Sequence, residues 1–258
     1  MKNVTHSVVI GLAIMGLFSM CVCPTAWGDQ TSGDKGTATK EISQEELAAS
    51  VPALGALHKV VYPLWHSAYA EKNYALIKEL LPQADTLIAK LDEATLPGIL
   101  REKQERWEGG KANLKSALKQ LHNAAEANSQ EEMLKQTEAF HAAYERLVRT
   151  IRPIVPELEA FHQELYKLYH YYAPEYDLEQ IRSAAAAMQG KIPALKEAQL
   201  PKRLADRQEG FQAAVKELEA AVNGLNDTDT ATADVKEKIL AAVEKVHVAY
   251  QRTEKLFD

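Results

Sequence analysis

Cysteine is scarce in this sequence, and its placement excludes several kinds of site. The 258-residue chain has two cysteines, Cys21 and Cys23, and both lie in an apolar N-terminal segment that we expect to be removed. The remaining chain can then form neither a disulfide nor a thiolate metal site. The C-x-x-C-H pattern of covalent haem attachment is absent, and with only Met133 and Met188 left a methionine-rich copper site is excluded too. Stability must therefore come from burial of a core.

Long runs of one charge sign are also missing. The formal net charge is −6, and loss of Lys2 with the N-terminal segment makes it −7. Such a chain has no electrostatic footprint for nucleic acid or for an anionic membrane surface, so we expect no nucleic-acid partner. A protein partner is left open. The sequence has no Ser-His-Asp order, glycine-rich phosphate loop or isolated carboxylate pair, so it names no catalytic residue and we expect a protein that is not an enzyme.

The N-terminus has the features of a secretory signal peptide. A charged start is followed by an apolar run from Val8 to about Cys23, shorter than the ~20 residues that span a membrane. Ala26 and Gly28 stand at −3 and −1 of a cleavage site after Gly28. We expect residues 1–28 to be removed, leaving a periplasmic or secreted protein with no membrane insertion; a retained anchor is the alternative.

The rest of the chain is predicted to be all-α. Residues 29–42 are polar and without periodicity, which predicts a disordered leader. Ser43 and Glu46 then have capping-box spacing, and apolar residues follow a helical period with breaks at Pro, Asn and Asp. The predicted helices are 52–71, 73–94, 97–125, 130–152, 156–173, 177–199, 201–225 and 233–257.

An internal repeat divides these helices into two sets of four. Residues 57–121 align without gaps on residues 161–225, with 18 identities in 65 positions. The apolar positions Leu100, Trp107, Leu114 and Leu121 recur every seven residues, as in a bundle seam. We therefore predict two tandem antiparallel four-helix units, each up-down-up-down, from an internal duplication: residues 43–152 and 153–258.

Histidine and tyrosine recur at corresponding positions of the two units. The six histidines are His58, His66, His141, His162, His170 and His247. The accompanying tyrosines are Tyr62, Tyr144, Tyr166 and Tyr250. Steps of four residues place each first-helix row on one broad face, and the fourth helix is its neighbour in a bundle. The pattern predicts a pocket between the first and fourth helices.

One hypothesis is that each pocket binds a metal ion or a non-covalent haem b. Neutral imidazole is a common ligand for Zn, Cu, Ni and Fe. His58 and His66 are ~12 Å apart along a helix, so only one of them can join His141 at one centre. We expect His141 and His247, which we place on the inward seam of the fourth helices, to matter most. Glu138-x-x-His141 and its counterparts in the second unit match a di-iron carboxylate site poorly, because the motifs fall on the wrong helices.

The alternative is a protein without metal, with a structural, interaction or small-ligand-binding role. The histidines would then form a buried polar layer with tyrosines, and Gln104 and Gln208 would pair with His58 and His162 across the core. Arg146, Arg149 and Arg152 close the fourth helix. Their cluster is explained by the helix dipole or by an anion-binding end.

Overall fold

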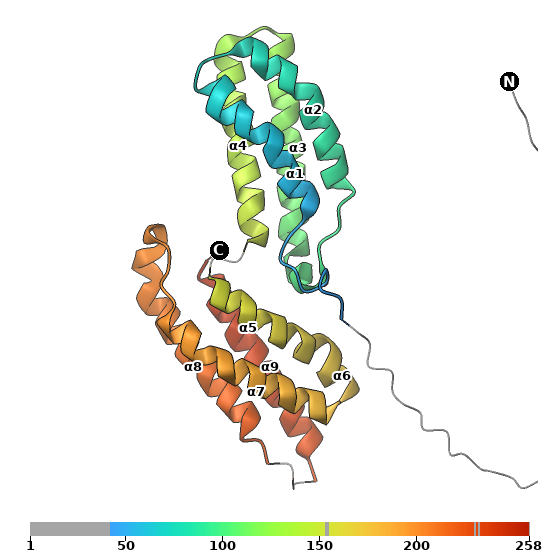
Figure 1. The fold of residues 1–258 in the computed structure, drawn as a ribbon, viewed down its shortest axis with the longest axis vertical. Helices are drawn as coiled ribbons and strands as arrows, with labels where there is room; N and C mark the ends of the chain where they lie inside the picture. The colour runs from blue at the N-terminus through green and yellow to red at the C-terminus, as the bar shows by residue number, and fades with distance from the viewer. Residues whose placement is uncertain (1–41, 153–154, 230, 232, 258) are drawn as a thin grey trace, which may run out of the picture. The chain divides into compact units, whose positions relative to one another are not determined.

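The structure is a computed structural model that describes residues 42–152, 155–229, 231 and 233–257 (Figure 1). Every regular element in this part of the chain is helical, which confirms the all-α prediction. The predicted signal peptide and nearly all of the predicted leader lie outside the described residues. None of the helices described is both long enough and apolar enough to cross a membrane.

The first set of helices ends at Ile151. It comprises α1 (Pro52–Pro63), a π-helical segment (Leu64–Tyr69), α2 (Tyr74–Asp92), a 3-10 segment (Gly98–Lys103), α3 (Gln104–Glu126) and α4 (Gln130–Ile151). Side chains cap two of the starts: Asn73 accepts a hydrogen bond from the amide of Leu76, and Ser129 accepts one from that of Glu132. Such caps satisfy amides that have no partner within the helix.

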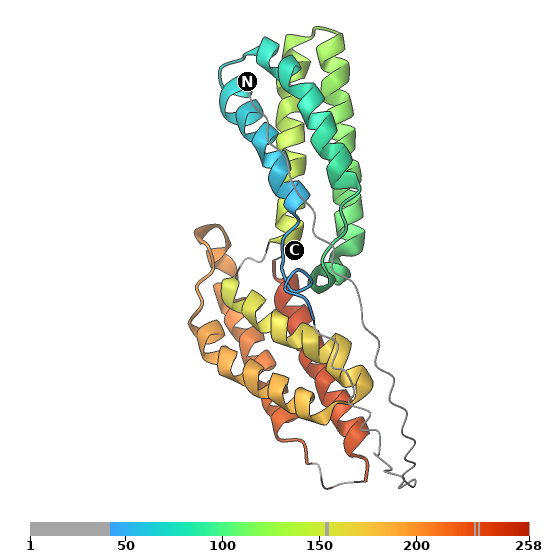
Figure 2. The same ribbon diagram turned by 45° about the vertical axis from the view of Figure 1, so that its right-hand side comes forward.

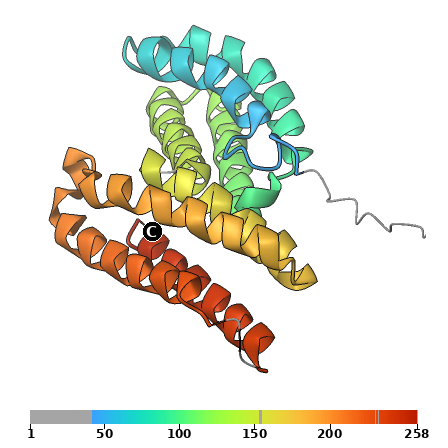
Figure 3. The ribbon, with the colours of Figure 1, turned by 60° about the horizontal axis from the view of Figure 1, so that its bottom comes forward.

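The second set repeats this order. It comprises α5 (Pro156–Lys167), a π-helical segment (Leu168–Tyr172), α6 (Ala173–Glu175), α7 (Leu178–Glu197), a 3-10 segment (Lys202–Arg207), α8 (Gln208–Asn226) and α9 (Val235–Lys255). The starts of α5, α7 and α8 come 104 residues after those of α1, α2 and α3, and both irregular segments keep the same spacing. In Figures 2 and 3, α1 to α4 run beside one another, and so do the helices from α5 to α9.

Each set of helices surrounds its own hydrophobic core. One cluster of buried side chains runs from Leu47 to Ile151 and adds Tyr166, and a second runs from Val155 to Tyr250. The predicted seam is confirmed, because Trp107 and its counterpart Phe211 are fully buried. The other seam positions are buried too: Leu100, Leu114, Leu121, Leu204, Leu218 and Leu225.

Tyr166 of α5 links the two cores, which lie within one compact unit of residues 41–258. Its ring packs with the first cluster, and its hydroxyl donates a 2.7 Å hydrogen bond to Glu46 Oε1. Tyr171 also donates to Glu46, and Arg101 donates to the Tyr166 hydroxyl. These hydrogen bonds hold the turn before α1 and the 3-10 segment after α2 against α5.

Candidate functional site

Histidine and aromatic rings pair between α1 with its π-helical segment and α4. The indole of Trp65 and the imidazole of His141 stack with centroids 4.2 Å apart and an interplanar angle of 8°. One level away, the His58 ring stacks on Tyr144 at 6.0 Å. Tyr62 lies between two histidines on the same helical row, 5.7 Å from His58 and 4.5 Å from His66.

The second set of helices repeats both stacks. Tyr169 stands where Trp65 does and stacks on His247 at 3.8 Å, while His162 stacks on Tyr250 at 4.4 Å. Tyr166 lies 4.8 Å from His170. Four of the six histidines therefore stack on an aromatic ring between the first and last helical stretches of their set: His58, His141, His162 and His247. His66 and His170 have tilted ring contacts with Tyr62 and Tyr166 of their own row.

The expected inward position of His141 is wrong. The buried face of α4 carries Met133, Thr137, Phe140, Tyr144 and Leu147. His141 is half-buried, because it follows Phe140 by one residue and so lies about 100° around the helix from it. His247 does lie inward and is only 8% exposed.

The first-row residues of α1 face solvent. His58 and His66 are exposed, and so is Tyr62, whose exposed fraction is 54%. The expected pairing of glutamines with histidines is also wrong. Gln104 donates to Glu108, and Gln208 bonds the backbone at Leu200 and Ala198. These glutamines satisfy local groups where a 3-10 segment passes into a helix.

In the part of the chain that the structure describes, these side chains are not arranged as a metal centre. Among the described residues no group of three His, Cys, Asp or Glu side chains is placed to hold an ion. Two of the three glutamates in Glu-x-x-His motifs accept hydrogen bonds from tyrosine hydroxyls: Tyr69 donates to Glu138 at 3.4 Å, and Tyr169 donates to Glu244 at 2.9 Å.

Burial keeps several of these imidazoles neutral. Desolvation lowers the pKa of His141 and of His170, and it lowers the pKa of His162 to about 3 with help from the positive charge of Lys103. His247 Nε2 lies 2.8 Å from Glu102 Oε1. The hydrogen bond from His247 lowers the pKa of Glu102 to about 2, against the opposing effect of burial.

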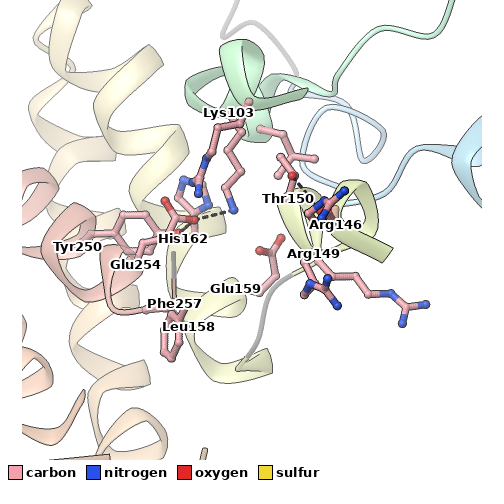
Figure 4. Close-up of a pocket in the computed structure, with 13 residues that line it drawn as sticks. Lys103, Arg146, Arg149, Thr150, Leu158, Glu159, His162, Tyr250, Glu254 and Phe257 are labelled. Atoms are coloured by element: carbon pink, nitrogen blue, oxygen red, sulfur yellow. Dashed lines mark hydrogen bonds and ion pairs between the residues drawn. The ribbon is translucent and has the colours of Figure 1, made fainter. Parts of the chain in front are cut away.

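A second site is a cavity of about 360 Å³ beside His162 (Figure 4). The end of α4, the start of α5, the end of α9 and the 3-10 segment Gly98–Lys103 contribute its walls. The lining residues are Leu100, Lys103, Arg106, Arg146, Arg149, Thr150, Arg152, Leu158, Glu159, His162, Tyr250, Glu254 and Phe257.

Positive charge dominates this lining, with five basic side chains against two glutamates. Glu254 is already matched by Lys103, whose Nζ lies 2.8 Å from its carboxylate. Arg149 makes only a long, exposed contact of 3.6 Å with Glu145. Within the described residues no ion pair is recorded for Arg146 or Arg152. The cavity therefore holds cationic groups that the protein itself leaves available.

Glu159 is the unusual residue of the cavity. Its Oε1 is buried and has no hydrogen-bond partner among the described residues. Desolvation raises the pKa of Glu159 to about 7; Lys103 opposes this rise and Glu254 adds to it. In Figure 4 its carboxylate points into the space between Arg146 and Arg149 on one side and Lys103 with Glu254 on the other. A carboxyl held in this way titrates near neutral pH.

Two features visible in the sequence lie in this cavity: the arginine cluster at the end of α4, and Glu159, which has Glu-x-x-His spacing with His162. Lys103, Tyr250 and Glu254 are distant in the chain, and their place beside these residues could not be predicted from sequence. No family model matches the chain, and no characterised protein or solved structure is significantly similar to it.

Proposed function

We propose that this protein binds a small anionic molecule in the cavity that contains Glu159. The observation that carries the proposal is the excess of basic side chains around a partly open cavity; two of them, Arg146 and Arg152, have no recorded ion pair in the described chain. Guanidinium groups present planar donor pairs that match carboxylate and phosphate oxygens.

The other wall of the cavity supports an organic ligand. Leu100, Leu158 and Phe257 supply apolar surface opposite the charged groups, and Tyr250 adds an aromatic ring. Ligand sites commonly combine apolar walls with a few convergent polar groups. A volume of about 360 Å³ lies at the lower end of the range for small-molecule sites.

Isothermal titration calorimetry with a panel of small anions tests the proposal. The panel is phosphate, sulfate, malate, succinate and phenyl phosphate, and the double variant Arg146→Ala/Arg149→Ala is compared with wild type. We expect at least one anion to bind, its affinity to fall with added salt, and the variant to lose about 10-fold or more.

The control is Arg252→Ala, which removes an exposed arginine of α9 that does not line this cavity. It should bind as wild type does. Failure of every anion to bind wild-type protein, or equal binding by the double variant, would overturn the proposal.

A metal ion or haem bound by the histidines is the second candidate function. It is supported by the proximity of the three histidines in each half: His58 and His66 act electrostatically on His141, and His170 and His247 act on His162. Elemental analysis and an absorption spectrum of protein purified without added metal test it. Stoichiometric metal that is lost in His141→Ala/His247→Ala, and lost below a pH of about 6.5 where imidazole becomes protonated, would support this function. Metal-free, colourless protein that binds none of Zn, Cu, Ni or Fe contradicts it.

We further propose that the protein is exported and that cleavage follows Gly28. The charged start, short apolar run and small residues at −3 and −1 support this. N-terminal sequencing of the protein recovered from the cell envelope or medium should begin at Asp29. Recovery of the intact chain in the cytoplasm would contradict it.

A tandem duplication of one four-helix unit is the proposed origin of the fold. It is supported by the sequence repeat and by helix starts that recur 104 residues apart. The matching π-helical segments add to this, because π-helices are rare. An experimental structure in which residues 52–151 and 156–257 fail to superpose would contradict the duplication.

A further inference from the structure

We infer that Glu159 selects, among small anions, those that carry their own O–H donor beside the negative group, such as hydrogen phosphate or a hydroxy acid. This inference rests on the proposed anion-binding function and concerns the same cavity. The ligand class follows from one side chain, Glu159, which has a buried oxygen without a hydrogen-bond partner among the described residues.

One carboxylate oxygen of Glu159 has no hydrogen-bond partner among the described residues. Glu159 Oε1 is buried and accepts no hydrogen bond from the described residues. Lys103, the cation that lowers the pKa of Glu159, already pairs with Glu254 at 2.8 Å. An ionised carboxylate can only accept hydrogen bonds, and leaving it buried without one is costly. A ligand that fills the cavity must therefore bring a donor to this oxygen or leave it unpaired.

Charged and titratable groups from several elements share the cavity with Glu159. Lys103 comes from the 3-10 segment, Glu254 and Tyr250 from α9, and His162 from the same helix, α5. Only Lys103 and Glu254 are identified as charges that shift its pKa, and their effects oppose each other. Burial is therefore the main cause of the raised pKa of Glu159. Because that pKa is about 7, the carboxylate form predominates at a pH of about 8. The arginines of α4 also line the cavity, and they are not among the charges that shift the pKa of Glu159. A bound molecule can thus place its anionic group at the arginines and a separate donor at Glu159.

Pairs of similar anions that differ in having an O–H donor distinguish these two cases. Hydrogen phosphate and sulfate are both tetrahedral dianions at a pH of about 8, but only hydrogen phosphate has an O–H to donate. Malate and succinate are four-carbon dicarboxylates, and only malate has a hydroxyl. Sulfate and succinate must meet an ionised, unpaired Glu159 or force it to take up a proton, and either event weakens binding.

Titration calorimetry at a pH of about 8 with these two matched pairs tests the inference. We expect wild-type protein to bind phosphate over sulfate, or malate over succinate, by about 10-fold or more, the size of one charged hydrogen bond. The pair that is discriminated identifies whether the anionic group is a phosphate or a carboxylate. Affinity for sulfate or succinate should fall up to about tenfold per pH unit above 7, because binding then requires protonation of Glu159.

The variant Glu159→Gln supplies both a donor and an acceptor without charge. We expect it to bind both members of the discriminated pair within about threefold of each other and to lose the fall in sulfate or succinate affinity above pH 7. The matched control is Glu157→Gln on the same first turn of α5, which does not line the cavity and should keep the wild-type preference. Circular dichroism establishes that each variant is folded.

The outcomes separate the two proposals. If no anion binds wild-type protein, the proposed function fails and the inference falls with it. If anions bind through the arginines but neither pair is discriminated, or Glu159→Gln retains the wild-type preference, the function stands and the inference is overturned.

Discussion

His141 of α4 and Trp65 of the first π-helical segment lie face to face, with ring centroids 4.2 Å apart and planes only 8° from parallel. The equivalent pair in the second set, His247 and Tyr169, stacks at 3.8 Å. In both sets an aromatic ring of the first helix covers a histidine of the last. The first and last helices of each set are thus joined by ring stacking as well as by aliphatic contacts.

We predict that this pair contributes coupled stability to the first set of helices. His141→Ala and Trp65→Ala should each lower the melting temperature, and their double-mutant cycle should show a coupling of about 0.5–1.5 kcal/mol. Chemical denaturation of the four proteins measures it. His122→Ala is the control, because His122 pairs with Asp85 at the surface and stacks on nothing recorded in the described chain. A coupling near zero would mean that the stack is incidental.

Acid should destabilise the protein through His162. Burial lowers its folded-state pKa from 6.5 to about 3, so the unfolded chain binds the proton more readily. The contribution of neutral His162 is fully present above pH 6.5 and is lost as the pH falls toward 3. Compared with wild type, His162→Gln should lose less stability between pH 6.5 and 4. Denaturation curves at several pH values measure the difference, and parallel pH profiles would contradict the prediction.

Glu159 should have the opposite pH dependence. Its folded-state pKa is raised from 4.5 to about 7, so its contribution to stability is fully present below pH 4.5 and is lost as the pH rises through 7. Glu159→Gln should therefore raise the melting temperature at pH 8 and change it little at pH 4. Differential scanning calorimetry at the two pH values measures this. A lower melting temperature for the variant at pH 8 would show that ionised Glu159 stabilises the empty protein.

Gly98 should not tolerate a side chain. A Cβ at this position would meet the Tyr166 hydroxyl and the side chain of Glu46, which are hydrogen-bonded to each other. Gly98→Ala should destabilise the protein by about 1–3 kcal/mol, because the added methyl group displaces these groups. Gly55→Ala is the control: its Cβ would meet nothing within 4 Å, and alanine should stabilise α1 by about 0.5–1 kcal/mol. Equal effects of the two substitutions would contradict the close approach at Gly98.

The helices could be predicted from sequence because the periodic apolar positions and the breaks at Pro, Asn and Asp are local signals. The predicted start at 130 agrees with α4, and the seven-residue spacing that begins at Leu100 identified buried positions correctly. The π-helical and 3-10 segments were not predicted. Apolar periodicity and breaks at Pro, Asn and Asp do not distinguish such short segments from the α-helices that they adjoin.

The position of His141 shows where periodicity alone is insufficient. The row Leu134, His141 and Val148 has seam spacing, but the buried row of α4 lies about 100° away and includes Phe140 and Leu147. Both rows are apolar enough to fit a bundle, and only the neighbouring helices decide between them. The cavity could not be predicted from the sequence either, because its walls come from four separate stretches of the chain.

The two π-helical segments bear on the order of events in the history of this chain. A π turn bonds residue i to residue i+5 and holds one residue more than an α turn, which is the geometry that a single-residue insertion in a helix would produce. The segments begin at Leu64 and Leu168, which correspond in the repeat. One insertion before the proposed duplication accounts for both, whereas separate origins would need the same rare event twice. On that proposal, the insertion is older than the second half of the protein, and the pairing of aromatic and histidine rings beside it was inherited by both copies.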